Sequence, residues 1–128
     1  MKRVPTMSTL PTRALCVVAI LGVMFSLAPR AFAHAVLVKS TPQAHTAVKG
    51  PEVSIDLQFN SRVDGSRSAL TIVTAGGQAH TLTISPQDAP DHLATKATGL
   101  VKGSYTIRWQ ALSSDGHISR GQIPFDVQ

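Results

Sequence analysis

A histidine at residue 34 and an Asp-Gly-His triplet at residues 115–117 are the residues of this chain best suited to bind a metal ion. A free α-amine has an ordinary pKa of about 7.7–8, so an amino-terminal histidine can chelate a metal through its amine and its ring Nδ1 together. Asp115 and His117 stand at i and i+2, which places two side chains on one side of an extended backbone. Taken singly, a lone histidine or an Asp-Gly turn is more often an ordinary surface feature.

Together these groups form a donor set of one amine, two imidazoles and one carboxylate. Three nitrogens and one oxygen in a tetragonal arrangement suit Cu(II), whereas Zn²⁺ prefers a tetrahedral site. Cu(I) prefers sulfur ligands, but the one cysteine and the three methionines of the chain all precede residue 34. If His34, Asp115 and His117 meet in space, which their spacing in the sequence does not show, the chemistry favours one Cu(II) ion per chain held by these three residues.

The chelate requires that His34 be a chain terminus, and residues 1–33 have the pattern of a cleaved secretory signal. A basic start is followed by an uncharged apolar run at 14–28 and by the small-x-small triplet Ala31–Ala33, as in signal peptides. As a helix, the apolar run would extend roughly 22 Å, short of the ~30 Å hydrocarbon core, which disfavours a membrane anchor. We therefore expect cleavage after Ala33 and a periplasmic or secreted domain over residues 34–128.

Removal of the signal changes the charge of the protein. The full chain has a formal charge of +5, from twelve Lys and Arg against seven Asp and Glu. Four of the basic residues precede residue 34, so residues 34–128 carry eight against seven. A net charge of about +1 without a basic stripe argues against a nucleic-acid partner. This segment has no cysteine, so an ordinary hydrophobic core must hold one domain without a disulfide.

Residues 34–128 read as an all-β domain. Several segments alternate apolar and polar residues with the period of two that is typical of half-buried strands, and Gly76-Gly77 marks a hairpin between two of them. Pro124 indicates an edge position or a bulge, and Trp109 is expected in the core. About seven short strands favour a Greek-key β-sandwich of immunoglobulin-like type. The expected strands span 34–40, 53–59, 68–75, 79–85, 92–99, 104–110 and 122–127.

Three segments resemble the CopC-type periplasmic copper-binding family of copper-resistance proteins. They are HAVLVKSTP from residue 34, VSIDLQF from residue 53 and GSYTIRWQALSSDGHISRGQIPFDV from residue 103. The resemblance covers essentially all of residues 34–127 and implies a β-sandwich that binds Cu(II) through His34, Asp115 and His117. Because residues 34–128 lack methionine, the chain resembles the members that bind only Cu(II). Members often have an acidic residue after the LQF segment, where this chain has Asn60, which leaves the support of the site by that residue open.

The expected function is that of an extracytoplasmic copper buffer or carrier, not an enzyme. A monomer is expected, whose partners are the copper ion and a separate inner-membrane copper transporter. Two alternatives stay open at this point: a copper-dependent oxidative enzyme of the histidine-chelate type, and a metal-free sandwich that acts as an interaction module. The sequence assigns no role to His45, His80 or His92.

Overall fold

The computed structural model describes residues 34–128, and the expected signal peptide and its cleavage site lie outside the described residues. In order along the chain, the elements are β1 (Leu37–Thr41), β2 (Ala47–Val48), β3 (Val53–Phe59), the 3₁₀-helix η1 (Gly65–Arg67), β4 (Ala69–Thr74), β5 (Ala79–Leu82), β6 (His92–Ala97), β7 (Gly103–Leu112) and β8 (Ile118–Val127). Within residues 34–128 there is no helix long and apolar enough to cross a membrane.

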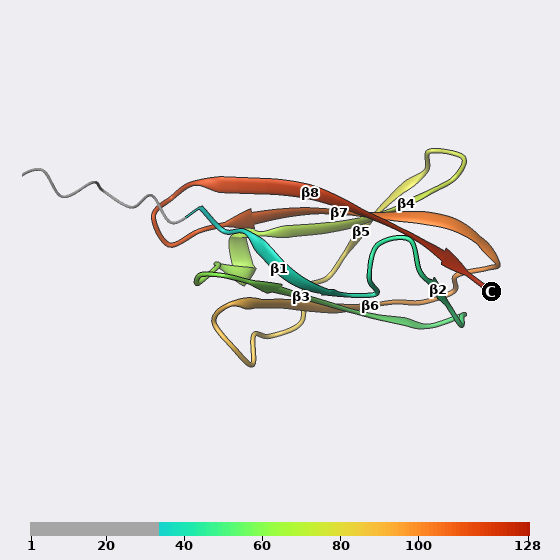
Figure 1. Ribbon diagram of the computed structural model, residues 1–128, viewed down its shortest axis with the longest axis horizontal. Coiled ribbons are helices and arrows are strands. Elements are labelled where there is room, and N and C mark those ends of the chain that lie inside the picture. Colours follow the sequence, from blue (N-terminus) through green and yellow to red (C-terminus); the bar gives the residue numbers. More distant parts are fainter. Residues whose placement is uncertain (1–33) are drawn as a thin grey trace, which may run out of the picture. The chain divides into compact units, whose positions relative to one another are not determined.

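The strands form two sheets that lie face to face, as Figure 1 shows. One sheet has the order β1-β3-β6, and the other has the order β2-β8-β7-β4-β5. The chain leaves the first sheet after β3, builds β4 and β5 in the second, returns to the first at β6 beside β3, and crosses back at β7 beside β4. This interlocked crossing confirms the expected immunoglobulin-like Greek-key sandwich.

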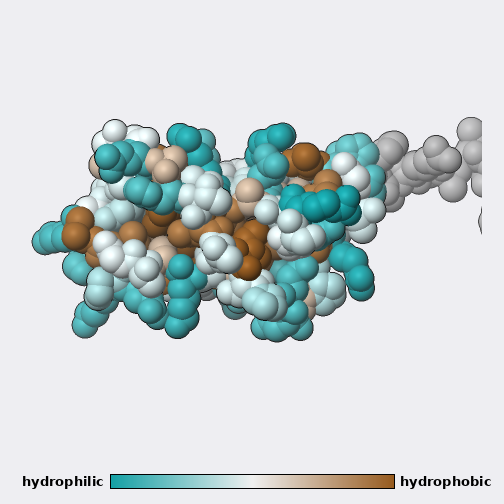
Figure 2. All heavy atoms as spheres, turned by 180° about the vertical axis from the view of Figure 1, so that it is seen from behind, coloured by the Kyte–Doolittle hydropathy of each residue, from teal (hydrophilic) through white to brown (hydrophobic). Residues whose placement is uncertain are grey.

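Alternating side chains of both sheets fill the space between them. In β3, Val53, Ile55, Leu57 and Phe59 are all buried, and the residues between them are exposed or half-buried. The core continues into β7 with Trp109, whose indole meets the ring of Phe59 edge to face at a centroid distance of 5.2 Å. Figure 2 shows apolar residues as a band along the middle of one face, with hydrophilic residues on both sides of it. The predicted placement of Trp109 in the core is confirmed.

The β7–β8 hairpin is the element that positions the Asp-Gly-His triplet. Its two ten-residue strands pair from Gly103 with Val127 at one end to Leu112 with Ile118 at the other. At ~3.3 Å per residue, the two ends of the hairpin lie roughly 30 Å apart. The loop at residues 113–117 joins the strands at one of these ends, beside the start of β1 (Figure 1).

All seven expected strands are present, with differences at their ends. β8 begins four residues before the expected position 122, and β1 begins at Leu37 rather than at residue 34. The sequence missed β2, because two residues paired in parallel with Asp126 and Val127 leave no alternating pattern. The expected edge position of the strand with Pro124 is wrong for β8 as a whole, because β8 lies between β2 and β7. Pro124 itself precedes the two residues that pair with β2, so its missing N–H removes no bond of that short ladder.

Candidate metal centre

The structure brings the two ends of the predicted site together. His34 precedes β1 and His117 precedes β8, and both side chains are exposed. Their ring centroids lie 4.8 Å apart with the rings nearly perpendicular, at 81°. Residues separated by most of the domain thus place two imidazoles within reach of one small ion.

A tight turn holds Asp115 against His117. The backbone N–H of Gly116 donates to the carbonyl of Ser113 at 2.9 Å, and the N–H of Ser113 donates to the carbonyl of His117 at 2.8 Å. Gly116 has a φ of 86°, a left-handed conformation that a side chain disfavours. Asp115 Oδ1 accepts the backbone N–H of His117 at 3.0 Å, and Asp115 Oδ2 lies 3.1 Å from His117 Nδ1.

These contacts hold Asp115 in its ionised form. Its pKa is lowered from the ordinary value mainly by the backbone N–H of His117. The side-chain hydrogen bond with His117 and the charges of His117 and His34 lower the pKa further, whereas partial burial opposes them. A deprotonated carboxylate is the form that binds metal, so the loop favours the form of Asp115 that could act as a metal ligand.

The backbone after His34 is anchored at two successive residues. Ala35 is 2% exposed and belongs to the core, and its N–H donates to the side-chain oxygen of Ser113 at 3.0 Å. The N–H of Val36 donates to Asn60 Oδ1 at 2.8 Å, and the N–H of Asn60 donates back to the carbonyl of Val36 at 2.9 Å. The backbone that follows His34 is therefore fixed against both Ser113 and Asn60.

Asn60, where members of the family often have an acidic residue, contacts the backbone close to His34. Its carboxamide oxygen accepts the N–H of Val36 at 2.8 Å, so the neutral side chain fixes the backbone two residues after His34. Sequence reasoning gave no role to Ser113, although a serine that opens a turn often hydrogen-bonds to the backbone.

The three predicted ligands meet as two pairs rather than as one cluster. His117 contacts both His34 and Asp115. Across residues 34–128, no three His, Cys, Asp or Glu side chains are gathered as a metal-binding group. A complete donor set at this end of the sandwich would therefore need the amine of His34 as well as adjustment of the side chains around His117.

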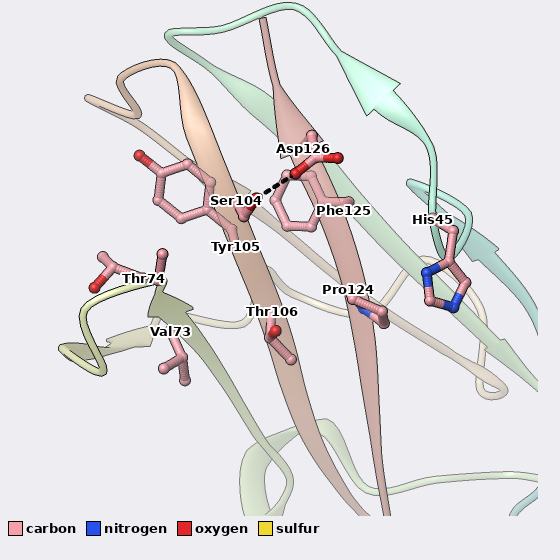
Figure 3. A pocket seen from close by; sticks show the side chains of 10 residues that line it. His45, Val73, Thr74, Ser104, Tyr105, Thr106, Pro124, Phe125 and Asp126 are labelled. Carbon is pink, nitrogen blue, oxygen red and sulfur yellow. Dashed lines mark hydrogen bonds between the residues drawn. The ribbon is translucent and has the colours of Figure 1, made fainter.

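The other histidines lie away from this pair. His45 lines a cavity of about 250 Å³ at the opposite end of the β7–β8 hairpin, and the predicted ligands are not among the residues of that cavity. Figure 3 shows His45 at one edge of the cavity and, beside Tyr105 and Phe125, the hydrogen bond that Ser104 donates to Asp126 at 2.6 Å. His80 is exposed on β5, and His92 Nδ1 lies 3.0 Å from Asp56 Oδ1 on the three-stranded sheet.

The protein is an immunoglobulin-like β-sandwich without a disulfide. It presents two histidines and an aspartate at one end. The family model described as the CopC domain matches residues 37–128. The chain therefore belongs to the CopC family.

Individual relatives agree with this assignment. The crystal structure of CopC from Methylosinus trichosporium OB3b superposes with a TM-score of 0.68 at 32% identity, over 74% of this chain and 94% of that one. PcoC, a methionine-rich copper resistance protein from Escherichia coli, gives a TM-score of 0.65 at 28% identity, over 75% of this chain and all of that one. The copper transport protein CutJ of Bacillus subtilis is 29% identical over 99 residues, which cover 75% of this chain but 18% of CutJ.

Proposed function

We propose that this protein is an extracytoplasmic Cu(II) buffer or carrier whose metal site forms at the amino terminus exposed by cleavage after Ala33. The observation that carries the proposal is the approach of the His34 and His117 rings to 4.8 Å, with the Asp115 carboxylate on His117. Relatives named for copper resistance and copper transport support copper as the ion.

Each group has a distinct role in the proposed site. The amine and ring Nδ1 of His34 chelate one Cu(II) ion, and the imidazole of His117 supplies a third nitrogen. Asp115 supplies the oxygen through Oδ2, which lies 3.1 Å from His117 Nδ1, while Oδ1 keeps its hydrogen bond from the backbone N–H of His117. An ionised carboxylate has lone pairs for both partners. Three nitrogens and one oxygen match the tetragonal preference of Cu(II).

The proposed role is binding and transfer of the ion rather than catalysis. Asp115 as fourth ligand would fill a position that copper-dependent oxidative enzymes keep open for oxygen. The exposure of both imidazoles would let a partner reach the metal directly. We propose a separate inner-membrane copper transporter as that partner, and a monomer as the carrier.

A Cu(II) titration of two forms of the protein tests the role of the amine. One form begins at His34 with a free amine, and in the other this amine is acetylated. We expect tight binding of one equivalent with a tetragonal Cu(II) spectrum only in the first form, because acetylation converts the amine to an amide. Equal binding by both forms would refute the amine as a ligand.

Matched histidine variants locate the site within the domain. We expect His117→Ala to lose most of the Cu(II) affinity of the free-amine form and His45→Ala to retain it, because His45 lies at the other end of the β7–β8 hairpin. Asp115→Asn should change the Cu(II) spectrum as well as the affinity. Absence of Cu(II) binding by the free-amine form itself would overturn the proposed function.

A further inference from the structure

Ser113 occupies an unusual position in this domain. It follows β7 directly, forms an isolated β-bridge with Val63, and is 3% exposed. Among the described residues, only Ser113 and Thr95 are polar and buried. A buried hydroxyl is costly unless it makes hydrogen bonds, so the partners of Ser113 show why it is placed there.

The backbone and the side chain of Ser113 hydrogen-bond to the two segments that carry the proposed ligands. Its backbone N–H donates to the carbonyl of His117, and its carbonyl accepts from Gly116, which together close the loop that carries Asp115. Its side-chain oxygen accepts the N–H of Ala35 at 3.0 Å, across 78 positions of sequence. One residue thus joins both parts of the site.

The contact with Ala35 controls the position of His34 through peptide geometry. The His34–Ala35 peptide unit is planar and includes the Cα of His34. With Ala35 buried in the core and its N–H held by Ser113, this plane is fixed, and so is the Cα of His34. The amine and the imidazole both branch from that Cα, so only rotations about single bonds remain to bring them to the metal.

We propose that Ser113 is the positioning residue of the metal centre, which sets His34 against the Asp115–His117 loop before the ion arrives. This inference rests on the proposed function for its effect on copper, but the anchoring itself exists without metal. Groups that orient metal ligands typically change metal affinity by roughly 10–100-fold when they are removed.

The first test needs no copper and uses the folded protein that begins at His34. We expect the Ala35 amide to be protected from hydrogen exchange and the ring protons of His34 and His117 to show a nuclear Overhauser contact. Ser113→Ala should speed exchange at Ala35 at least roughly tenfold and remove the ring contact. The exposed neighbour provides the matched control, since Ser114→Ala should change neither signal.

The second test measures Cu(II) affinity in a double-mutant cycle. Ser113→Ala should weaken binding roughly tenfold or more when His34 is intact with a free amine. In an amino-terminally acetylated form with His34→Ala, neither donor of residue 34 is available, so the same change should cost less than about twofold. An equal loss in both backgrounds would mean that Ser113 acts on the loop or on stability alone, and would overturn the inference.

Further results distinguish a wrong inference about Ser113 from a variant that does not fold and from a failure of the proposed copper function. If Ser113→Ala does not fold, Ser113→Thr takes its place as the test variant. It retains the hydroxyl, so the Ala35 amide should stay protected from hydrogen exchange. Rapid exchange at Ala35 in the unmodified protein would overturn the anchoring. If Ala35 is protected and the ring contact is present but Cu(II) does not bind, the proposed function fails while the anchoring by Ser113 is supported.

Discussion

Replacement of Gly121 by alanine should destabilise the hairpin that carries the metal loop. Gly121 of β8 pairs directly with Trp109 of β7. An added Cβ would lie 2.6 Å from the indole Nε1 of Trp109 and closer still to two ring carbons. The indole is 8% exposed and packs edge to face on Phe59, so it cannot move without disturbing the core.

The expected cost follows from these contacts. Overpacking of a filled core typically costs about 1–3 kcal/mol. Displacement of the indole also weakens the Phe59–Trp109 contact, and such pairs contribute about 0.5–1.5 kcal/mol. We therefore expect Gly121→Ala to lower the free energy of unfolding by about 2–4 kcal/mol. For a domain of this size, this loss corresponds to a Tm decrease of about 10–25 °C.

Urea unfolding followed by fluorescence measures this loss directly, because Trp109 is the one tryptophan of the chain. The emission of the variant should also shift to the red, since displacement exposes the indole. Gly76→Ala is the matched control, because its added Cβ would meet one atom at an ordinary 3.8 Å, and we expect a change within about 0.5 kcal/mol. A wild-type unfolding midpoint and emission spectrum for Gly121→Ala would refute the reasoning.

Three further outcomes test the site and the loop beside it. Asn60→Ala should lower Cu(II) affinity about fivefold, equivalent to about 1 kcal/mol, because the N–H of Val36 loses its acceptor. Asn60→Asp keeps an acceptor and should retain the affinity, and competition titration of the two variants measures the difference. Gly116→Ala should cost about 1–2 kcal/mol in urea unfolding, because its φ of 86° is unfavourable for alanine. The hydrogen bonds from Ser66 and Arg67 lower the pKa of Asp64 from 3.8 to about 2. The contribution of Asp64 to the free energy of unfolding is therefore present above about pH 4 and lost as the pH falls through about 2. Over this interval the unfolding midpoint of Asp64→Asn should fall less than that of the wild type.

The sequence predicts the strands of this protein better than its site. Alternation in segments such as Val53–Phe59 has a direct physical cause, because every second side chain enters the core. The meeting of His34 with His117 has no local cause, since it depends on how two sheets pack, and here only the family resemblance implied it. Ser113 escaped prediction for the same reason, because its role depends on a partner 78 positions away.

The hydrogen bond between Ala35 and Ser113 also bears on when the protein can take up its ion. It joins the segment before β1 to the loop between β7 and β8, so it forms only when these two distant parts of the chain have come together. Under the proposed function, partly folded chains would compete poorly for Cu(II), and binding would stabilise only finished molecules. Copper loading would then be selective for molecules in which the segment before β1 and the loop before β8 have already come together.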